Sequence, residues 1–153
     1  MLQLCRHDYF RTLLMGEVHD ADAMTRHLRL LRSRMDPERS CVLLELGHPE
    51  DDGYLALHWH YGADRLEVAM RNFFHAELAG MRILVSVLPD ERLYLLACPM
   101  VGMEAPADPE QLLRLVREHA EENIDDVREY LRIDLRVTSA RVLKNLSELT
   151  LAN

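Results

Sequence analysis

Two adjacent carboxylates stand at a tight turn between two apolar stretches of this chain. The segment VLPDERLYLL, residues 87–96, places Asp90 and Glu91 at the tip of an expected hairpin, and a third acid, Glu45, interrupts the apolar run SCVLLELGH. Paired carboxylates can hold Mg²⁺ for phosphoryl transfer when a loop also cradles the phosphates. Acids are also common at exposed turns simply because turns face water, so the neighbouring residues have to decide between these two interpretations.

The histidines offer a second possible chemistry. His58 and His60 are two residues apart, so a strand over residues 54–60 would point both rings the same way, and His48 and His75 could lie within reach. The segment YLALHWHYG fits either a strand or the first turns of a helix, and the pattern does not separate the two. A single His-x-His among 8 histidines is not a recognised zinc-ligand spacing. We therefore expect no metal site, with a His-based metal sensor as an alternative.

Composition excludes several classes of protein. A chain of 153 residues has the size of one domain, and its 48% hydrophobic and 29% charged residues are ordinary globular values. The formal charge of −8 repels phosphate backbones, so the chain alone is a poor binder of nucleic acid. Cys5, Cys41 and Cys98 form no C-x-x-C motif and cannot all pair, which indicates a reducing compartment. With neither a signal peptide nor an apolar run of membrane-spanning length, we expect a cytoplasmic protein.

The elements that position these residues follow from hydrophobic periodicity. Two helices are expected before residue 37, the first ending at Gly16 and the second including Met24, Leu28, Leu31 and Met35. A buried strand follows at 40–48, then a helix from Asp64 as N-cap to Gly80 as terminator, then the hairpin with a central return strand. A long helix begins with Asp108 and Pro109 and ends near Tyr130, and an edge strand starts near Ile133.

This order predicts an α+β fold. From residue 40 it runs strand, helix, strand, strand, helix, strand, which is typical of a ferredoxin-like sandwich with an antiparallel sheet covered by helices on one face. The leading helices, residues 1–36, would pack on this body or dimerise it, because their apolar stripe of Tyr9, Phe10, Leu13 and Leu14 has to be covered. Residues 37–153 would form the domain itself.

Four stretches in this order resemble a known family. They are DYFRTLLMG, RSCVLLELGH, RNFFHAELAG and SARVLKNLSELTLAN, and together they are similar to the degenerate GGDEF-like modules, of nucleotidyl-cyclase fold, inside AraC-type and PucR-type bacterial transcription regulators. The resemblance implies a regulatory domain that receives a signal or dimerises. It also implies a homodimer, a possible small-molecule effector, and DNA contact only through a helix-turn-helix domain that this sequence lacks. The short final helix pattern from Ser147 suggests a chain truncated before that domain.

The resemblance also bears on the acidic turn. Active diguanylate cyclases carry Gly-Gly-Asp/Glu-Glu-Phe there, and the corresponding residues are Leu88, Pro89, Asp90, Glu91 and Arg92. The two glycines of the cyclases allow close approach of a nucleotide. Here Leu88, which is bulky, and Pro89, which has no N–H donor, replace them. Glu45 stands where the family has a metal-binding aspartate. We expect a non-enzyme with no catalytic, cofactor or metal residues; the alternative is a nucleotidyl cyclase or nucleotide-binding relic that uses Glu45, Asp90 and Glu91 with Mg²⁺.

Overall fold

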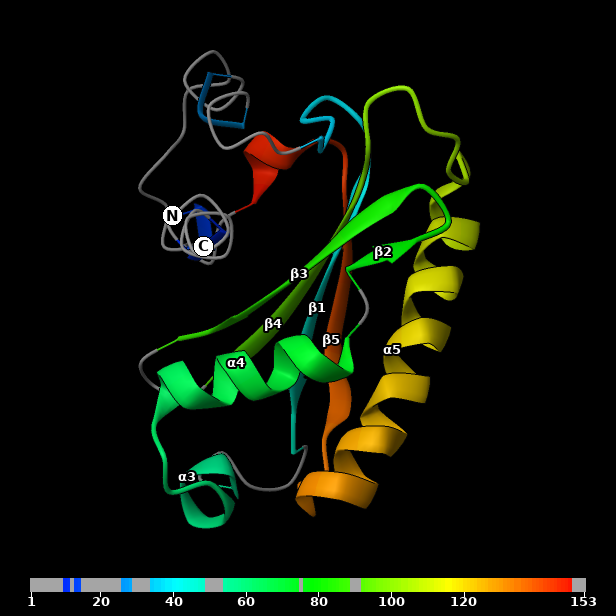
Figure 1. Cartoon of the computed structure of the whole chain (residues 1–153). Helices are drawn as coiled ribbons and strands as arrows, with labels where there is room; N and C mark the ends of the chain where they lie inside the picture. The colour runs from blue at the N-terminus through cyan, green and yellow to red at the C-terminus, as the bar shows by residue number, and fades with distance from the viewer. Residues whose placement is uncertain are drawn as a thin grey trace.

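The fold is built on one antiparallel sheet. The computed structural model describes residues 10–11, 13–14, 26–28, 34–48, 54–74, 76–88 and 92–149. The sheet order is β2-β3-β4-β1-β5 (Figure 1). Its strands are β1 (Cys41–Gly47), β2 (Glu77–Leu78), β3 (Met81–Val87), β4 (Leu93–Pro99) and β5 (Arg136–Leu143). The predicted hairpin is confirmed as β3 and β4, and β4 is central because β1 pairs with its other side. β5 is an edge strand as expected, but it begins at Arg136 and not near Ile133.

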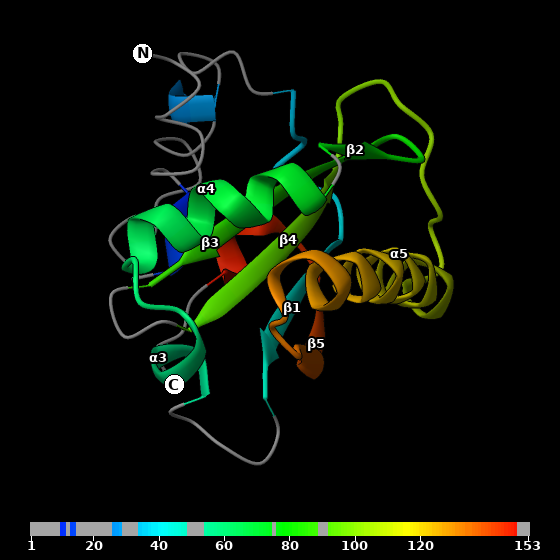
Figure 2. The same cartoon turned by 60° about the horizontal axis from the view of Figure 1, so that its bottom comes forward.

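Two helices cover the first face of the sheet. They are α4 (Ala63–Phe73) and α5 (Pro109–Leu131), which lie on the same side of the strands in Figure 2. Alternate strand residues such as Val42, Leu44 and Val85 pack with Leu66 of α4 and Val116 of α5 in one buried cluster. Strand alternation with a period of two places these side chains on one face. The first face is therefore a conventional core between sheet and helices.

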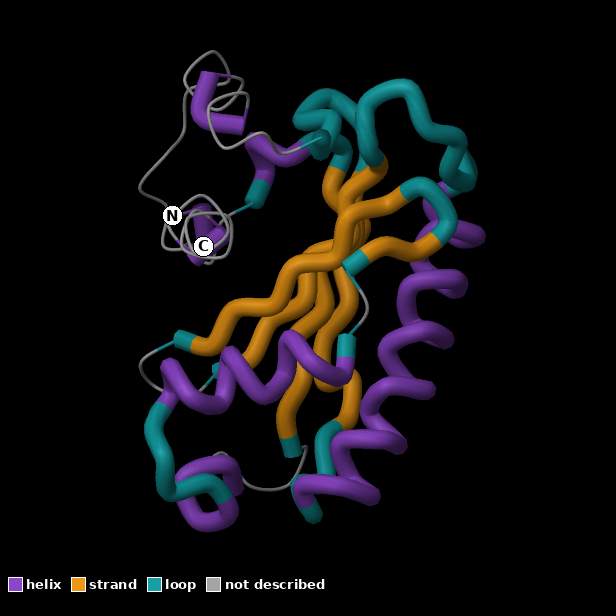
Figure 3. The backbone as a smooth tube through the Cα atoms, in the orientation of Figure 1, coloured by secondary structure: helices purple, strands orange, loops and turns teal. Residues whose placement is uncertain are grey.

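The second face is also buried, which corrects the expectation of helices on one face only. The intervening strand residues, including Leu43, Leu84 and Leu96, pack with Phe10, Leu13 and Leu14 of the leading region. The 3₁₀ helix η1 (Leu146–Glu148) adds Leu146 to this cluster, and Figure 3 shows it on the way to the chain end. Phe10, Leu13 and Leu14 are 0% exposed. These three residues of the predicted apolar stripe are thus covered within the single chain, and Tyr9 lies outside the described residues.

Local capping explains α5. Asp108 accepts a hydrogen bond from the Glu110 backbone N–H, and Pro109 occupies the first turn, as the sequence predicts. Arg132 ends the helix in the left-handed conformation at φ 59°. The ambiguous segment is settled as the short helix α3 (Tyr54–His58), followed by a loop up to Gly62.

Three local predictions are wrong. Asp64 is not the N-cap of α4, because Gly62 is, without any side-chain cap. Gly80 does not terminate that helix; it lies at φ 81° in the turn between β2 and β3, so Leu78 is in a strand. Met35 is not helical, since it forms an isolated antiparallel bridge with Met100. In the last two cases a strand pairing, of β2 with β3 and of Met35 with Met100, overrides the local helical pattern.

The class is therefore mixed α+β with a five-stranded antiparallel sheet and three α-helices in the described ranges. The ferredoxin-like topology is not confirmed by a sheet of this order, because β2 adds a strand outside β3. No helix within these ranges is long and apolar enough to cross a membrane.

Candidate functional site

Glu45 is the predicted acid whose surroundings are described. It lies on β1, directly opposite Tyr94 of β4 and Ser139 of β5. The Tyr94 hydroxyl donates to Glu45 Oε1 at 3.4 Å, and Arg92 Nη1 donates to that hydroxyl at 3.4 Å. Burial, and then the nearby Glu45 carboxylate, raise the pKa of Tyr94. The Tyr94 hydroxyl therefore keeps its proton and donates a hydrogen bond to the Glu45 carboxylate.

A polar row crosses the second face of the sheet at this level. Ser86, Tyr94, Glu45 and Ser139 are cross-strand neighbours on β3, β4, β1 and β5. Ser86 is fully buried, and its Oγ has no hydrogen-bond partner. Hydroxyls and one carboxylate can bind a polar group by hydrogen bonds. No group of three or more His, Cys, Asp or Glu side chains among the described residues is placed to hold a metal ion.

The predicted acids Asp90 and Glu91 lie outside the described residues, but the base of their turn does not. The Leu88 N–H donates to the Arg92 carbonyl at 2.9 Å, directly beyond the last ladder pair of Val87 and Leu93. The Leu88 side chain is 1% exposed and belongs to the second-face cluster. A bulky residue therefore fills the core at the start of the turn.

The described histidines do not share the strand that the metal-site alternative assumed. His58 ends α3 and His60 follows in an exposed loop, so the strand alternation that would point both rings the same way does not apply. His58 Nδ1 lies 2.9 Å from the Tyr54 carbonyl oxygen. The Tyr54 ring stacks with His58 at 3.9 Å and with His48 at 4.4 Å between centroids. His75 lies outside the described residues.

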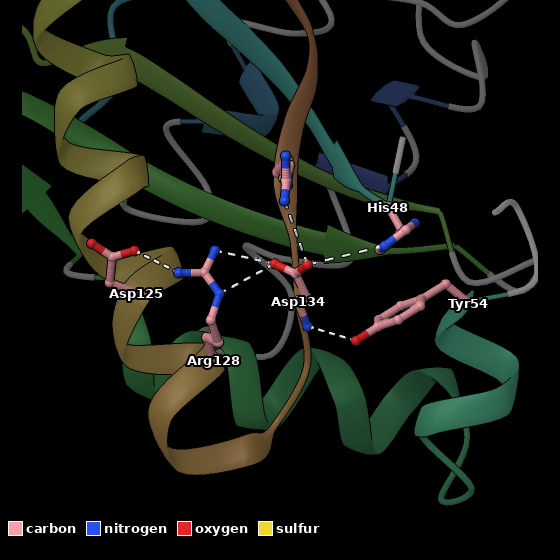
Figure 4. A network of polar contacts seen from close by, with 6 residues as sticks. His48, Tyr54, Asp125, Arg128 and Asp134 are labelled. Carbon is pink, nitrogen blue, oxygen red and sulfur yellow. Dashed lines mark hydrogen bonds and ion pairs between the residues drawn. The ribbon is translucent and has the colours of Figure 1, made fainter. Parts of the chain in front are cut away.

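Asp134 is the centre of a polar network at the C-terminal end of α5 (Figure 4). Its Oδ1 accepts from Arg128 Nε at 3.2 Å and Nη2 at 3.1 Å, and its backbone N–H donates to the Tyr54 hydroxyl at 2.9 Å. Arg136 Nη2 and His48 Nε2 lie 3.8 and 4.0 Å from Oδ2. The network ties the end of α5 to the start of β5 and to α3, so its charges stabilise the fold and none is left over for an external ion.

A groove of about 390 Å³ lies beside this network, between α5 and β5. Its apolar lining is Ile124, Leu135 and Val137, and its charged lining is Arg117, Glu121, Asp125, Arg128 and Arg136. Arg117 bonds Glu121 at 3.2 Å, and Arg128 bonds Asp125 at 3.0 Å. Because these arginines have acidic neighbours, the groove has little excess positive charge for a phosphate.

Sequence reasoning missed a buried carboxylate, Glu67. Its side chain is only 4% exposed, and Arg11 Nη2 donates to its Oε1 at 2.8 Å. Arg71, one turn on in α4, donates to Oε2 at 2.5 Å, and the Val87 N–H donates to Oε1 at 2.9 Å. Glu67 thus satisfies the Val87 backbone N–H, which points away from β4. Through Arg11 it also joins the leading region to α4. The available signal was the i,i+4 spacing of Glu67 and Arg71, each directly after an apolar residue, Leu66 and Met70.

Two of the three cysteines lie in the core, and Cys5 lies outside the described residues. Cys41 and Cys98 are free and fully buried in the second-face cluster. A hydrogen bond with Cys41 and burial raise the pKa of Cys98. A thiol with a raised pKa stays protonated, and a protonated thiol is a poor nucleophile.

No protein-family model, no curated protein and no solved structure matches this chain. Its function has to be argued from its own residues.

Proposed function

We propose that this chain is a regulatory module without chemistry of its own, which receives a signal or forms a homodimer within a bacterial transcription regulator. The proposal includes membership of the degenerate GGDEF-like class of AraC-type or PucR-type regulators and a cytoplasmic location. DNA contact belongs to a helix-turn-helix domain outside this sequence, since a net charge of −8 disfavours contact with phosphates. A small-molecule effector is possible.

The observation that carries the proposal is the burial of Leu88. In the resembling cyclases a glycine at this place lets a nucleotide approach the backbone. Here the Leu88 side chain is 1% exposed and packs with Phe10 and Leu13, so the volume next to the turn is core. Moving it out to admit a nucleotide would expose a leucine at a cost of roughly 1.5–3 kcal/mol.

The arrangement of the long strands supports the proposed relationship. Without β2, the order is β3-β4-β1-β5, and all of its pairings are antiparallel. Helix α4 connects β1 towards β3 across the intervening β4, and α5 connects β4 to β5 across β1. Two such split βαβ units are the pattern of a ferredoxin-like sandwich. We propose that the fold is a variant of it, extended at one edge by β2.

The alternative is a nucleotidyl cyclase or nucleotide-binding relic that uses Glu45, Asp90 and Glu91 with Mg²⁺. It is supported by the position of Glu45 on the strand beside β4, close to the turn. Against it, Glu45 already accepts a hydrogen bond from Tyr94. A metal sensor using His58 and His60 is a weaker alternative, because the two residues do not share a strand.

The test is whether the purified chain uses nucleotides or metals. We expect no cyclic product from GTP or ATP with Mg²⁺ or Mn²⁺, and no stoichiometric Zn²⁺ in the purified protein. Mg²⁺ and Mn²⁺ should also leave the melting temperature unchanged, both in wild type and in the Asp90→Ala, Glu91→Ala variant. A cation-dependent rise in wild type that the double variant loses, or any cyclic product, would overturn the proposal.

A further inference from the structure

Two reduced cysteines face each other across neighbouring strands. The antiparallel register of β1 and β4 pairs Val42 with Ala97. Continued by one residue, this register places Cys41 of β1 directly opposite Cys98 of β4. Both side chains are 0% exposed and lie in the second-face cluster, so they point to the same side of the sheet. The two thiols are also hydrogen-bonded to each other, so their sulfurs are close neighbours.

The backbone hydrogen bonds of β4 show what kind of pair the two cysteines form. In an antiparallel sheet, the backbone groups of successive residues point alternately to the two neighbouring strands. The Arg92 carbonyl accepts from the Leu88 N–H, and the Met100 N–H donates to the Gly80 carbonyl, both on the β3 side of β4. The even-numbered residues of β4, Cys98 among them, therefore point their backbone groups towards β3. The two cysteines are thus a non-hydrogen-bonded pair of β1 and β4.

A non-hydrogen-bonded pair has the geometry that a disulfide needs. Its Cα atoms lie about 4.5 Å apart, and its Cβ atoms are closer than those of a hydrogen-bonded pair. Disulfides join cysteines whose Cα atoms are about 4.4–6.8 Å apart. An S–S bond therefore fits the native register of β1 and β4 without a shift of either strand.

We propose that Cys41 and Cys98 are an oxidation site, at which hydrogen peroxide converts the two thiols into a disulfide that joins β1 to β4. The first thiol attacks the peroxide: an S–O bond forms, the O–O bond breaks, and a sulfenic acid and one water result. The second thiol then attacks the sulfenic sulfur, and its proton leaves with the hydroxyl as another water. Two thiols and one peroxide thus give one disulfide and two waters. The inference goes beyond the proposed function and does not depend on it.

Burial sets the rate and the selectivity of this reaction. The thiolate is the reactive form, and the raised pKa of Cys98 keeps that thiol protonated, so oxidation should be slower than that of an exposed cysteine. Phe10 and Leu13 pack in the same cluster, and hydrogen peroxide is small enough to reach the pair when this cover opens locally. Inside the cluster the neighbouring thiol is the partner at hand for a sulfenic acid. In a reducing compartment the two thiols are the resting state and the disulfide is transient.

The disulfide should stabilise the fold. It closes a loop between residues 41 and 98 and so restricts the unfolded chain, whereas the native strands keep their places. The loss on the native side is small, because the Cys98 thiol gives up one hydrogen bond to the Asp36 carbonyl, at 3.5 Å. We expect the urea midpoint to rise by about 1–2 M.

The experiment uses the whole chain and locates the bond directly. Trypsin, which cuts after arginine, leaves the three cysteines on separate peptides, residues 1–6, 40–65 and 93–114. The native chain is treated with hydrogen peroxide, its remaining thiols are blocked, and it is digested without reductant. Mass spectrometry should find residues 40–65 linked to residues 93–114, and dithiothreitol should separate them.

The controls distinguish this pair from chance pairing and from other oxidation. The chain oxidised in concentrated urea measures chance pairing and should also contain links to residues 1–6. Cys41→Ala and Cys98→Ala each remove one partner, so neither should gain stability from peroxide. The urea midpoint of the oxidised wild type is measured with and without dithiothreitol, which reduces the disulfide and leaves methionine sulfoxides in place.

Other results overturn the inference. They are thiols at both positions that stay reduced in prolonged excess peroxide, sulfinic acids at both positions without a link, and a link to residues 1–6 in place of the expected one. A linked chain whose midpoint is no higher than with dithiothreitol also overturns it, because the bond would then strain the native register. None of these results involves nucleotides or self-association, so failure of this site is distinguishable from failure of the proposed function.

Discussion

Replacing Glu67 by alanine should destabilise the fold far more than replacing an exposed acid. Three donors converge on this carboxylate: Arg11 at 2.8 Å, Arg71, and the Val87 backbone N–H at 2.9 Å. The Val87 donor lies on the outer side of β3, beyond the short pairing with β2. Removing the carboxylate therefore leaves a backbone group of the sheet without its partner.

The magnitude follows from burial. Leaving the Val87 N–H unsatisfied costs about 1–3 kcal/mol. Breaking a fully buried ion pair costs about 3–5 kcal/mol, whereas an exposed pair contributes about 0.2–1 kcal/mol. The Arg11 and Arg71 side chains are 28% and 22% exposed, so water replaces part of what they lose. We expect about 3 kcal/mol for Glu67→Ala, or a fall in melting temperature of about 6–12 °C.

Glu67→Gln separates the two contributions. An amide oxygen can still accept from the Val87 N–H, but the charge is lost, so we expect about 1–2 kcal/mol. The matched control is Glu77→Ala, because Glu77 is 59% exposed and 3.5 Å from Arg82, and it should change stability by no more than about 0.5 kcal/mol. Urea unfolding at one protein concentration measures all three variants. If Glu67→Ala costs no more than Glu77→Ala, the reasoning from burial is refuted; if Gln costs as much as Ala, the backbone hydrogen bond is not the larger part.

Two further predictions concern Tyr94 and Gly80. Because burial and Glu45 raise the pKa of Tyr94 above 10.0, the folded state holds this proton more tightly than the unfolded state does, so stability should fall as pH rises through and above about 10. Absorbance titration of the phenol measures this, and Glu45→Gln should lower that pKa; an unchanged value would contradict the role of Glu45. Gly80→Ala should cost about 2 kcal/mol or more in thermal unfolding, since φ is +81° and a Cβ would lie 2.1 Å from the Glu104 carbonyl oxygen. A cost below about 0.5 kcal/mol would show that this turn relaxes easily.

The elements predicted well are those with signals inside their own segment. Helix α5 begins with Asp108 and Pro109, and both belong to local rules for helix starts. Two apolar runs around a polar turn predict the hairpin of β3 and β4. Alternation of apolar and polar residues predicts β5 as a strand with one exposed face. None of these inferences needed knowledge of a distant residue.

Two of the errors fall where pairing with another strand decides the local structure. Leu78 fits the helical stripe of the segment before it, yet Glu77 and Leu78 pair with Arg82 and Met81. Met35 fits a helical stripe as well, but it bridges to Met100, 65 positions away in sequence numbering. Short segments have weak intrinsic preferences, so a few backbone hydrogen bonds to an existing strand outweigh them.

The charges of α5 show a different limit of sequence reasoning. The acids of the run EHAEENIDDVRE are exposed, as the period of the helix places them. Periodicity gives the stripe that contains Arg114, Arg117, Glu121 and Asp125, but it does not say what lies beside that stripe. The answer depends on the sheet order, because β5 rather than β3 is the neighbour of β1 at this end. Only the sheet order shows that this stripe lines one groove with Arg136 and Val137 of the edge strand β5.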